Sequence, residues 1–431
     1  MKVRKLWELP GEEREALLSR AQPDLTRAMK NAEFIVDRVR SGGDEALLQW
    51  TAEFDGVRLT ADRLRVSPDE FDRAAGTVPP ALRAAVETAI ANIRRFHEAT
   101  MPKAESVVTV SDGVTCTERF TPIDSVCLYV PRGRGSFSSV LCMLGVPAKL
   151  AGVPRIIVCT PPGPDGSVDD ATLYAARLIG IDEIYRVGGA QAVAAVAFGT
   201  RTIPACAKIV GPGNVYATAA KRLLSDRIDP GPGAGPSESI ILCDGSPNPR
   251  NVALNLLIEA EHGENSCALL VTHNEGLVRA VDAIVESEIP QLTEQRATYA
   301  REVLNSYGGA VLTRSLDESI TFVNEFAVEH LAIMTRDSRQ VAQRITNAGE
   351  ILIGDFPIIS LANYVVGVNA ILPTSRYART QSPVSVRDFM KACSIVELSE
   401  KAYRQFVAPV VAFSEHEGFC AHHRAAQKWQ T

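Results

Sequence analysis

The stretch RIIVCTPPGPDGSVDDATLYAARLIGIDEIYRVGGAQAVAAVAFG, residues 155–199, decides the fold class of this chain. Short apolar runs at 155–159 and 183–187 alternate with segments at 170–180 and 190–199, whose apolar residues recur at helical spacing. Alternating strands and helices of this kind build a parallel sheet that helices cover on both faces. The rhythm continues through AKIVG and VYATAAKRLLS, so we predict a parallel α/β domain here.

A second α/β unit follows a joint rich in proline and glycine, DPGPGAGPSES at 229–239. Beyond this joint the alternation resumes, from SIILCD through NVALNLLIEAEHG and SCALLVT to EILIGD. The first hundred residues and the chain after residue 385 read as helical, whereas SVVTV, GVTCTERF and SVCLYV look like strands. The sequence therefore predicts an α/β fold with two parallel-sheet units and helical extensions at both ends.

Composition excludes several classes of protein. Lys and Arg total 45 against 51 Asp and Glu, a net charge of −6, so the basic surface of a dedicated nucleic-acid binder is missing. No uncharged apolar run approaches the ~20 residues of a membrane-spanning helix, and the N-terminus turns acidic before a signal-peptide core can form. The nine cysteines mostly stand in apolar stretches, which is typical of buried thiols in a reducing compartment. We expect a cytoplasmic protein with no nucleic-acid or membrane partner.

Four glycine-bearing turns stand between a predicted strand and a predicted helix: PRGRGSFSS, VGGAQA, VGPGNVY and PGAGPSES. Glycine lets the backbone approach a ligand, and a helix N-terminus offers free N–H groups to phosphate. None completes the G-x-G-x-x-G dinucleotide fingerprint, because Tyr216 and Pro236 occupy third-glycine positions. A single such turn is usually a plain turn, but several at one sheet edge favour a ligand crevice. Arg132 and Arg134 could face an anion there, and exposure to solvent is the simpler interpretation.

Pairs of Glu and His residues are candidates for chemistry. Glu259 and His262 are three residues apart on a predicted helix, so both project from one face and could begin a zinc site. An isolated pair of this kind is more often simply solvated. Glu329 and His330 precede the predicted strand LAIMT, where they suit either an acid/base pair or a salt bridge in a loop. His422, in the terminal helix, would by default be a surface residue.

The joint occurrence of these features, with their order and spacing, resembles the histidinol dehydrogenase family. The matching segments extend over nearly the whole chain: VGGAQAVAAVAFGT, KIVGPGNVYATAAKRLL, AGPSES, EAEHG, NEFAVEHL, the stretch that ends in ILPT, and EGFCAH. The resemblance implies a homodimer whose subunits hold two incomplete Rossmann-like domains and exchange their helical tails, with one zinc ion per subunit and NAD as hydride acceptor. The implied boundaries are 1–24 for an N-terminal helical extension, 25–120 with 238–384 for one domain, 121–237 for the other, and 385–431 for the tail.

The resemblance also implies a role for individual residues. Glu329 and His330 match the family's acid/base pair. The zinc-ligand positions are Glu259, His262, Asn363 and His422, the last reaching in from the neighbouring subunit. The substrate-binding positions are Ser237, Glu259, His262, His330, Asn363, Glu417 and His422. The dinucleotide-binding positions are Tyr129, Gln191 and Asn214.

Four positions depart from the family's pattern. Glu259 stands where the family has glutamine and Asn363 where it has an aspartate ligand, so together they preserve one carboxylate and one carboxamide. Because zinc accepts carboxylate oxygen readily, we favour a retained metal over a metal-free site. Ala370 replaces a histidine near the substrate, and Val328 replaces the proline before the Glu-His pair. Loss of a polar side chain at 370 removes hydrogen-bond discrimination between substrates.

The implied reaction is the NAD-dependent oxidation of L-histidinol, through the aldehyde, to L-histidine. A neutral imidazole can take the hydroxyl proton, zinc would act as a Lewis acid, and Glu329 is the candidate for activating water in the second stage. Two alternatives stay open. One is a paralogue that oxidises another small polar alcohol, as sulfopropanediol dehydrogenases do, and the other is a catalytically silent binding protein. Retention of His262 and His422 beside the Glu-His pair argues against silence, because no structural requirement demands all of them.

Overall fold

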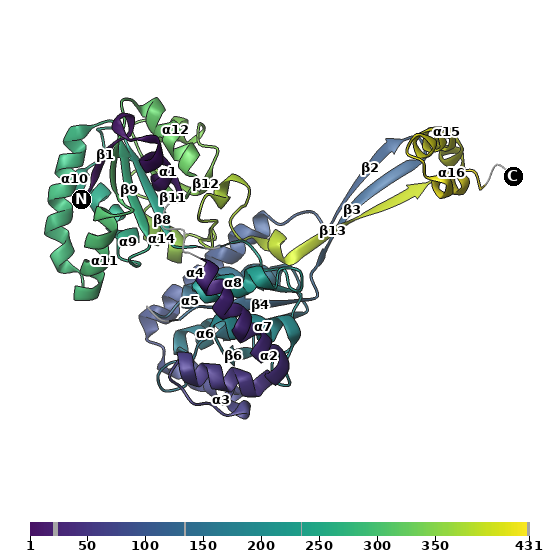
Figure 1. The fold of residues 1–431 in the computed structure, drawn as a ribbon, viewed down its shortest axis with the longest axis horizontal. Helices are drawn as coiled ribbons and strands as arrows, with labels where there is room; N and C mark the ends of the chain where they lie inside the picture. The colour runs from purple at the N-terminus through teal and green to yellow at the C-terminus, as the bar shows by residue number, and fades with distance from the viewer. Residues whose placement is uncertain (20–24, 133–134, 234, 429–431) are drawn as a thin grey trace. The chain divides into compact units, whose positions relative to one another are not determined.

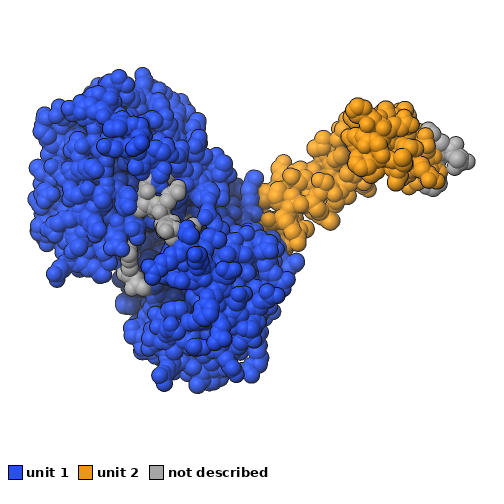
Figure 2. All heavy atoms as spheres, in the orientation of Figure 1, with its two compact units in different colours: residues 1–100, 123–389 blue, residues 101–122, 390–431 orange. Residues whose placement is uncertain are grey.

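The computed structural model describes residues 1–19, 25–132, 135–233 and 235–428. The chain forms two compact units, which Figure 2 colours separately. Unit 1 comprises residues 1–100 and 123–389, and unit 2 comprises residues 101–122 and 390–431. Within the described ranges, no helix combines the length and the apolar character needed to cross a membrane.

Sheet A, the larger sheet of unit 1, has six parallel strands in the order β1-β10-β9-β8-β11-β12. The strands are β1 (Val3–Lys5), β8 (Glu238–Cys243), β9 (Cys267–Thr272), β10 (Gly309–Leu312), β11 (Val328–Met334) and β12 (Ala348–Ile353). The chain supplies the edge strand β1 first. It re-enters the sheet at β8, extends it through β9 and β10, and then returns to the other side of β8 for β11 and β12. Strand order therefore reverses between β8 and β11, as in a doubly wound fold.

Helices cover both faces of sheet A (Figure 1). Ile241 of β8 packs with one group of helices, and its neighbours Ile240 and Leu242 pack with the other. Successive strand residues point to opposite faces, so a continuous apolar run such as IILC is what a strand covered on both sides requires. The first group is α9 (Pro249–Ala260), α10 (Glu275–Glu288) and α11 (Glu294–Asn305); the second includes α1 (Gly11–Ser19), α12 (Leu316–Phe326) and α13 (Ser338–Ala342).

Sheet B, the smaller sheet of unit 1, has four parallel strands in the order β6-β5-β4-β7. Here the order reverses between β4 and β7. The strands are β4 (Ser125–Tyr129), β5 (Arg155–Thr160), β6 (Ile184–Arg186) and β7 (Lys208–Val210), and the helices between and after them are α5 (Ser138–Leu150), α6 (Asp170–Ile179), α7 (Gly189–Phe198) and α8 (Val215–Leu223). The two parallel sheets confirm the predicted α/β class.

The N-terminal helices pack on the sheet B layer. Helix α2 (Leu25–Phe54), kinked at Gly43, contacts α7 and α8, while α3 (Pro68–Thr77) contacts α6 and α4 (Pro80–Ala99) contacts α5 and α6. The predicted domain that joins residues 25–120 to 238–384 stays a prediction. Helical periodicity identifies an apolar face but not the sheet that this face will cover.

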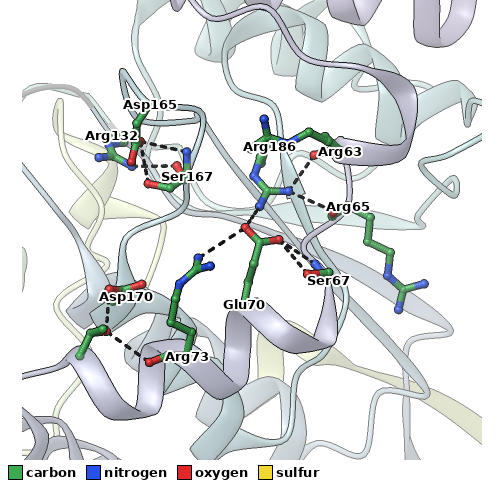
Figure 3. Close-up of polar contacts among 11 residues, drawn as sticks. Arg63, Arg65, Ser67, Glu70, Arg73, Arg132, Asp165, Ser167, Asp170 and Arg186 are labelled. Atoms are coloured by element: carbon green, nitrogen blue, oxygen red, sulfur yellow. Dashed lines mark hydrogen bonds and ion pairs between the residues drawn. The ribbon is translucent and has the colours of Figure 1, made fainter.

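Arg186 ties α3 to the end of β6. Its side chain is 1% exposed, and it donates to the Arg63 and Arg65 carbonyls, at 2.7 and 3.0 Å, and to the Glu70 carboxylate (Figure 3). Glu70 also accepts from the backbone N–H of Ser67, the cap of α3. The buried charge is therefore matched by one carboxylate and two carbonyl oxygens.

Replacing Arg186 by methionine is expected to lower the free energy of unfolding by about 3–5 kcal/mol, because Glu70 keeps a partly buried charge whose remaining ionic partner, Arg73, lies 3.9 Å away. Chemical denaturation monitored by circular dichroism measures the loss. The matched control is Arg177→Met, which breaks an exposed ion pair between α6 and Asp72 of α3 at 2.7 Å and should change stability by at most about 1 kcal/mol. Equal losses in the two variants would contradict this account.

Unit 2 contains an antiparallel sheet in the order β13-β3-β2 and two helices. The elements are β2 (Glu105–Ser111), β3 (Val114–Pro122), β13 (Met390–Leu398), α15 (Glu400–His416) and α16 (Cys420–Ala426). The prediction that the whole chain after 385 is helical is wrong for residues 390–398, which pair with β3 along their full length. Met, Lys, Ala and Glu give this stretch a helical propensity, and the pairing overrides it.

Candidate functional site

The Glu-His pair lies at the amino edge of sheet A. Glu329 and His330 are the second and third residues of β11. Glu238 opens β8 on one side of them, and Glu350 of β12 stands opposite His330 on the other. Amino ends of parallel strands meet at one edge, so the sheet itself gathers three carboxylates and one imidazole there, and two of the carboxylates, those of Glu329 and Glu350, contact the ring. Doubly wound sheets usually bind ligands at the carboxyl edge, and this cluster occupies the opposite one.

Helix α9 brings Glu259 and His262 toward the same edge. A helix that connects parallel strands runs against them, so its C-terminal end lies beside their amino ends. Glu259 is 1% exposed, and within the described part of the chain neither of its carboxylate oxygens has a hydrogen-bond partner. His262 Nδ1 lies 3.6 Å from Glu259 Oε1, and the same nitrogen lies 2.8 Å from the Ile258 carbonyl oxygen.

Glu329 and His330 are held in a defined geometry. Glu329 Oε2 accepts from the Glu238 backbone N–H at 2.9 Å, and its Oε1 lies 3.7 Å from His330 Nε2. His330 Nδ1 lies 2.5 Å from Glu350 Oε1. Burial raises the pKa of Glu329 against the opposing effect of His330. Burial alone would lower the pKa of His330, but the surrounding carboxylates, Glu329 foremost, outweigh it and raise that pKa.

The remaining predicted residues divide between the two units. Ser237 immediately precedes β8, and Asn363 lies on α14 (Ile359–Tyr364), which contacts α9; both are half-buried. Glu417 and His422 are exposed residues of unit 2, where the His422 ring packs 5.0 Å from that of Phe419. Across the described ranges, no three His, Cys, Asp or Glu side chains converge on one point as a metal site. Glu259 and His262 therefore form half of the predicted ligand set.

Two carboxylates of this site were not predicted from the sequence. Glu238 lies within the segment PGAGPSES, where it is the first residue of β8, and its Oε1 accepts from the Ser375 backbone N–H at 2.8 Å. Glu350 belongs to the strand AGEILI, in which a lone acidic residue ordinarily faces solvent. Only the pairing of β12 with β11 places it beside His330. The register between β11 and β12 is the signal that would have identified Glu350.

The predicted dinucleotide residues lie at the carboxyl edge of sheet B. Tyr129 ends β4, is 2% exposed, and its hydroxyl accepts from the Gly189 backbone N–H at 2.8 Å. Gln191 is buried in the first turn of α7. Asn214 caps α8, where its side-chain oxygen accepts from the Tyr216 and Ala217 N–H groups. The edge between β4 and β7 is where strand order reverses, which is the usual ligand position in such sheets.

Glycine is required in the turn that faces Tyr129. Gly211 has φ +131°, and a Cβ there would lie 2.1 Å from the Tyr129 carbonyl oxygen. The backbone after β7 can approach β4 this closely only without a side chain. Arg132, the half-buried arginine of the first glycine-bearing turn, donates to the Ser167 carbonyl at 3.3 Å (Figure 3). Arg134 lies outside the described residues.

Comparison with known proteins defines the family. The sequence model of histidinol dehydrogenase matches residues 18–429. The chain belongs to the histidinol dehydrogenase family. Members of this family are NAD-dependent oxidoreductases that act on CH–OH groups.

Individual relatives agree with the family assignment. A "Histidinol dehydrogenase homolog" of Cereibacter sphaeroides is 47% identical over 97% of this chain and 96% of its own length. A "Histidinol dehydrogenase" of Synechocystis is 42% identical over 98% and 97%. The crystal structure of histidinol dehydrogenase from Elizabethkingia anophelis, 33% identical, superposes with a TM-score of 0.92 over 99% of this chain and 96% of that one.

Proposed function

We propose that this chain is an NAD-dependent, zinc-assisted alcohol dehydrogenase, with L-histidinol as its default substrate and L-histidine, formed through the aldehyde, as its product. The observation that carries the proposal is the His330 imidazole, 4% exposed and set between the carboxylates of Glu329 and Glu350 at the amino edge of sheet A. A buried imidazole with an oriented ring nitrogen suits the acceptance of a hydroxyl proton.

The two members of the pair divide the proton transfers. His330 Nε2 takes the substrate hydroxyl proton, because Nδ1 is engaged with Glu350. Glu329, whose pKa burial raises, can hold or release a proton near neutral pH, as activation of water for a second oxidation requires. Both side chains are shielded from bulk solvent, which strengthens their electrostatic interactions.

Zinc fits the residues around α9. Two buried carboxylate oxygens of Glu259 without hydrogen-bond partners would be costly in the absence of a cation, and the adjacent His262 supplies a nitrogen ligand. Asn363 offers a carboxamide oxygen, and His422 would complete the set. A zinc ion held there would supply Lewis-acid stabilisation of the negative charge that develops on the substrate oxygen.

The carboxyl edge of sheet B suits a dinucleotide. The glycine turn at Gly211, the N-terminus of α8 capped by Asn214, and the Tyr129 hydroxyl surround one end of β4 and β7. Backbone N–H groups at a helix N-terminus bind phosphate, so these residues could hold the pyrophosphate of NAD. NAD bound there would accept the hydride that leaves the substrate carbon.

A second candidate is a paralogue that oxidises a different small polar alcohol. Ala370, half-buried, offers no hydrogen bond where the resemblance expects a histidine near the substrate. Relatives called "Histidinol dehydrogenase homolog" reach 47% and 46% identity, compared with 42% for the Synechocystis "Histidinol dehydrogenase". Both observations favour a changed substrate with an unchanged reaction.

A panel of amino alcohols and diols, each with NAD or NADP and followed at 340 nm, separates the candidates. Turnover of L-histidinol to L-histidine supports the first, and turnover of diols without histidinol supports the paralogue. No reduced dinucleotide from any alcohol, with purified and zinc-loaded protein, would favour a silent binding protein.

We further propose that the protein works as a homodimer that shares its active sites. Unit 2 exposes Val107, Val108 and Val110 of β2, which are 57–63% exposed, and Phe413 of α15, which is 70% exposed. Apolar surface of this kind on a small unit is typical of an interface. A swapped tail would bring His422 of the partner subunit to His262.

Shared sites predict complementation between inactive subunits. His330→Asn and His422→Ala should each be inactive, whereas their co-expressed mixture should recover roughly a quarter of wild-type activity, because each heterodimer holds one intact site. Activity per mole of chain, with the dimer verified by analytical ultracentrifugation, is the measurement. A mixture as inactive as either variant alone would show that each subunit uses its own tail.

A further inference from the structure

Glu350 lies on β12, the edge strand of sheet A that pairs with β11. It is aligned with His330 in the parallel register of β11 and β12, so both side chains emerge on the same face of sheet A. The Glu350 side chain is 8% exposed and that of His330 is 4% exposed. A carboxylate so deeply buried is stable only with a strong partner, and His330 is the basic residue it contacts.

The contact determines which ring nitrogen carries a proton. His330 Nδ1 lies 2.5 Å from Glu350 Oε1, the length of a strong, charge-assisted hydrogen bond. An ionised carboxylate only accepts hydrogen bonds, so Nδ1 must be the donor. The neutral ring therefore keeps its lone pair on Nε2, the nitrogen that faces Glu329 Oε1 at 3.7 Å. The acceptor for a substrate proton is set by the residue behind the ring.

The same contact favours the protonated ring. When Nε2 accepts a proton, the imidazolium that forms stands directly against a carboxylate in a site shielded from water, where Coulombic attraction is strong. The second oxygen of Glu350, Oε2, is buried and has no hydrogen-bond partner among the described residues, so none of them competes there with His330.

We propose that Glu350 is a positioning residue for His330: it fixes the Nδ1–H tautomer, orients the ring, and stabilises the imidazolium formed on proton transfer. The inference rests on the proposed role of His330 as proton acceptor. It concerns a residue on a neighbouring strand that does not itself contact the substrate. Orienting carboxylates of this kind act through the imidazole rather than on the reacting atoms.

Two substitutions separate orientation from charge. Glu350→Gln keeps a carbonyl oxygen that can accept from Nδ1–H but removes the negative charge, whereas Glu350→Ala removes both. We expect kcat to fall about 10-fold in the first and about 100-fold in the second, within the range found for residues that orient a histidine. KM should change by less than about threefold, because the substrate is not touched. Glu302→Gln, on the exposed face of α11, is the control and should match wild type.

The second measurement does not depend on turnover. ¹⁵N-edited NMR of labelled imidazoles reports which nitrogen carries the proton, and the His330 signals are assigned by their loss in His330→Asn. Wild type and Glu350→Gln should show Nδ1–H in the neutral ring, and Glu350→Ala should show the other tautomer or a mixture. If the Glu350→Ala variant fails to fold, the Glu350→Gln variant still tests the role of Glu350 through its kcat and through the shift of its His330 resonance.

The outcomes distinguish this proposal from the proposed function. Wild-type kcat and wild-type His330 signals in both variants would overturn the role of Glu350. A loss of kcat that only follows a smaller folded fraction, with unchanged His330 signals, would overturn it as well. If wild-type protein oxidises no alcohol, the proposed function fails, and the tautomer measurement still judges whether Glu350 orients His330.

Discussion

Replacement of His330 by asparagine is expected to lower kcat about 100- to 10,000-fold, the range over which general base catalysis acts. Asparagine keeps a polar side chain of similar reach at a buried position, but it cannot accept the substrate proton. Steady-state oxidation of the best alcohol from the panel, followed at 340 nm, measures the effect. KM should remain within a few-fold of wild type if the loss lies in the chemical step.

The control for this substitution is His273→Asn, because His273 is an exposed histidine of unit 1 away from the β11 edge. It should retain wild-type kcat. The pH dependence gives a further check. His330 accepts a proton only when neutral, so kcat/KM falls below its pKa, and the raised pKa places that fall above the ~6.5 of free imidazole. Activity that stays constant down to pH 5 would contradict a role for His330 as base.

Exchanging the side chains at positions 259 and 363, by Glu259→Gln together with Asn363→Asp, is expected to preserve zinc binding. This result would show that the carboxylate ligand occupies position 259 in this chain instead of position 363. Glu259→Gln removes the negative charge of the metal site, and Asn363→Asp adds one. Each single change should weaken zinc binding about 10- to 100-fold, since ligand charge and orientation both enter the affinity. The double variant restores one carboxylate and one carboxamide, and its zinc content and activity should return toward wild type.

Metal content per chain, measured after purification without chelators and again after dialysis against a chelator, tests this expectation. Chelation should abolish activity and added zinc should restore it. Glu264→Gln, an exposed carboxylate two residues beyond His262, is the matched control and should bind zinc as wild type does. Full activity with substoichiometric zinc would end the proposal that metal takes part.

Short-range patterns in the sequence predicted the parallel sheets. Apolar runs such as RIIVC and SIILC, bounded by amphipathic segments, can be buried only as strands covered on both faces, and β5 and β8 confirm this. The pairing of Met390–Leu398 with β3 could not be read in this way, because its partner lies far away in the chain. Residues with helical propensity became a strand through that long-range contact.

The site shows the same limit. The spacing of Glu259 and His262 on one helix face is local, and the structure keeps both at the end of α9. Local sequence patterns cannot identify Glu350 as a site residue, because its partner is determined by the register between two strands. Site residues whose partners lie on a neighbouring strand therefore cannot be predicted from a single sequence, whereas site residues spaced along one helix can.

Because the Glu-His pair lies on an inner strand of sheet A, catalytic activity depends on the correct folding of that sheet. The backbone of β11 is bonded on both sides, to β8 and β12, so changes within it disturb folding as well as chemistry. Helix α14, which contacts α9, and the segment around Ala370 form a border outside the strands of sheet A. Divergence toward new substrates can accumulate in that border while the reaction stays constant, and libraries aimed at altered specificity are best concentrated there.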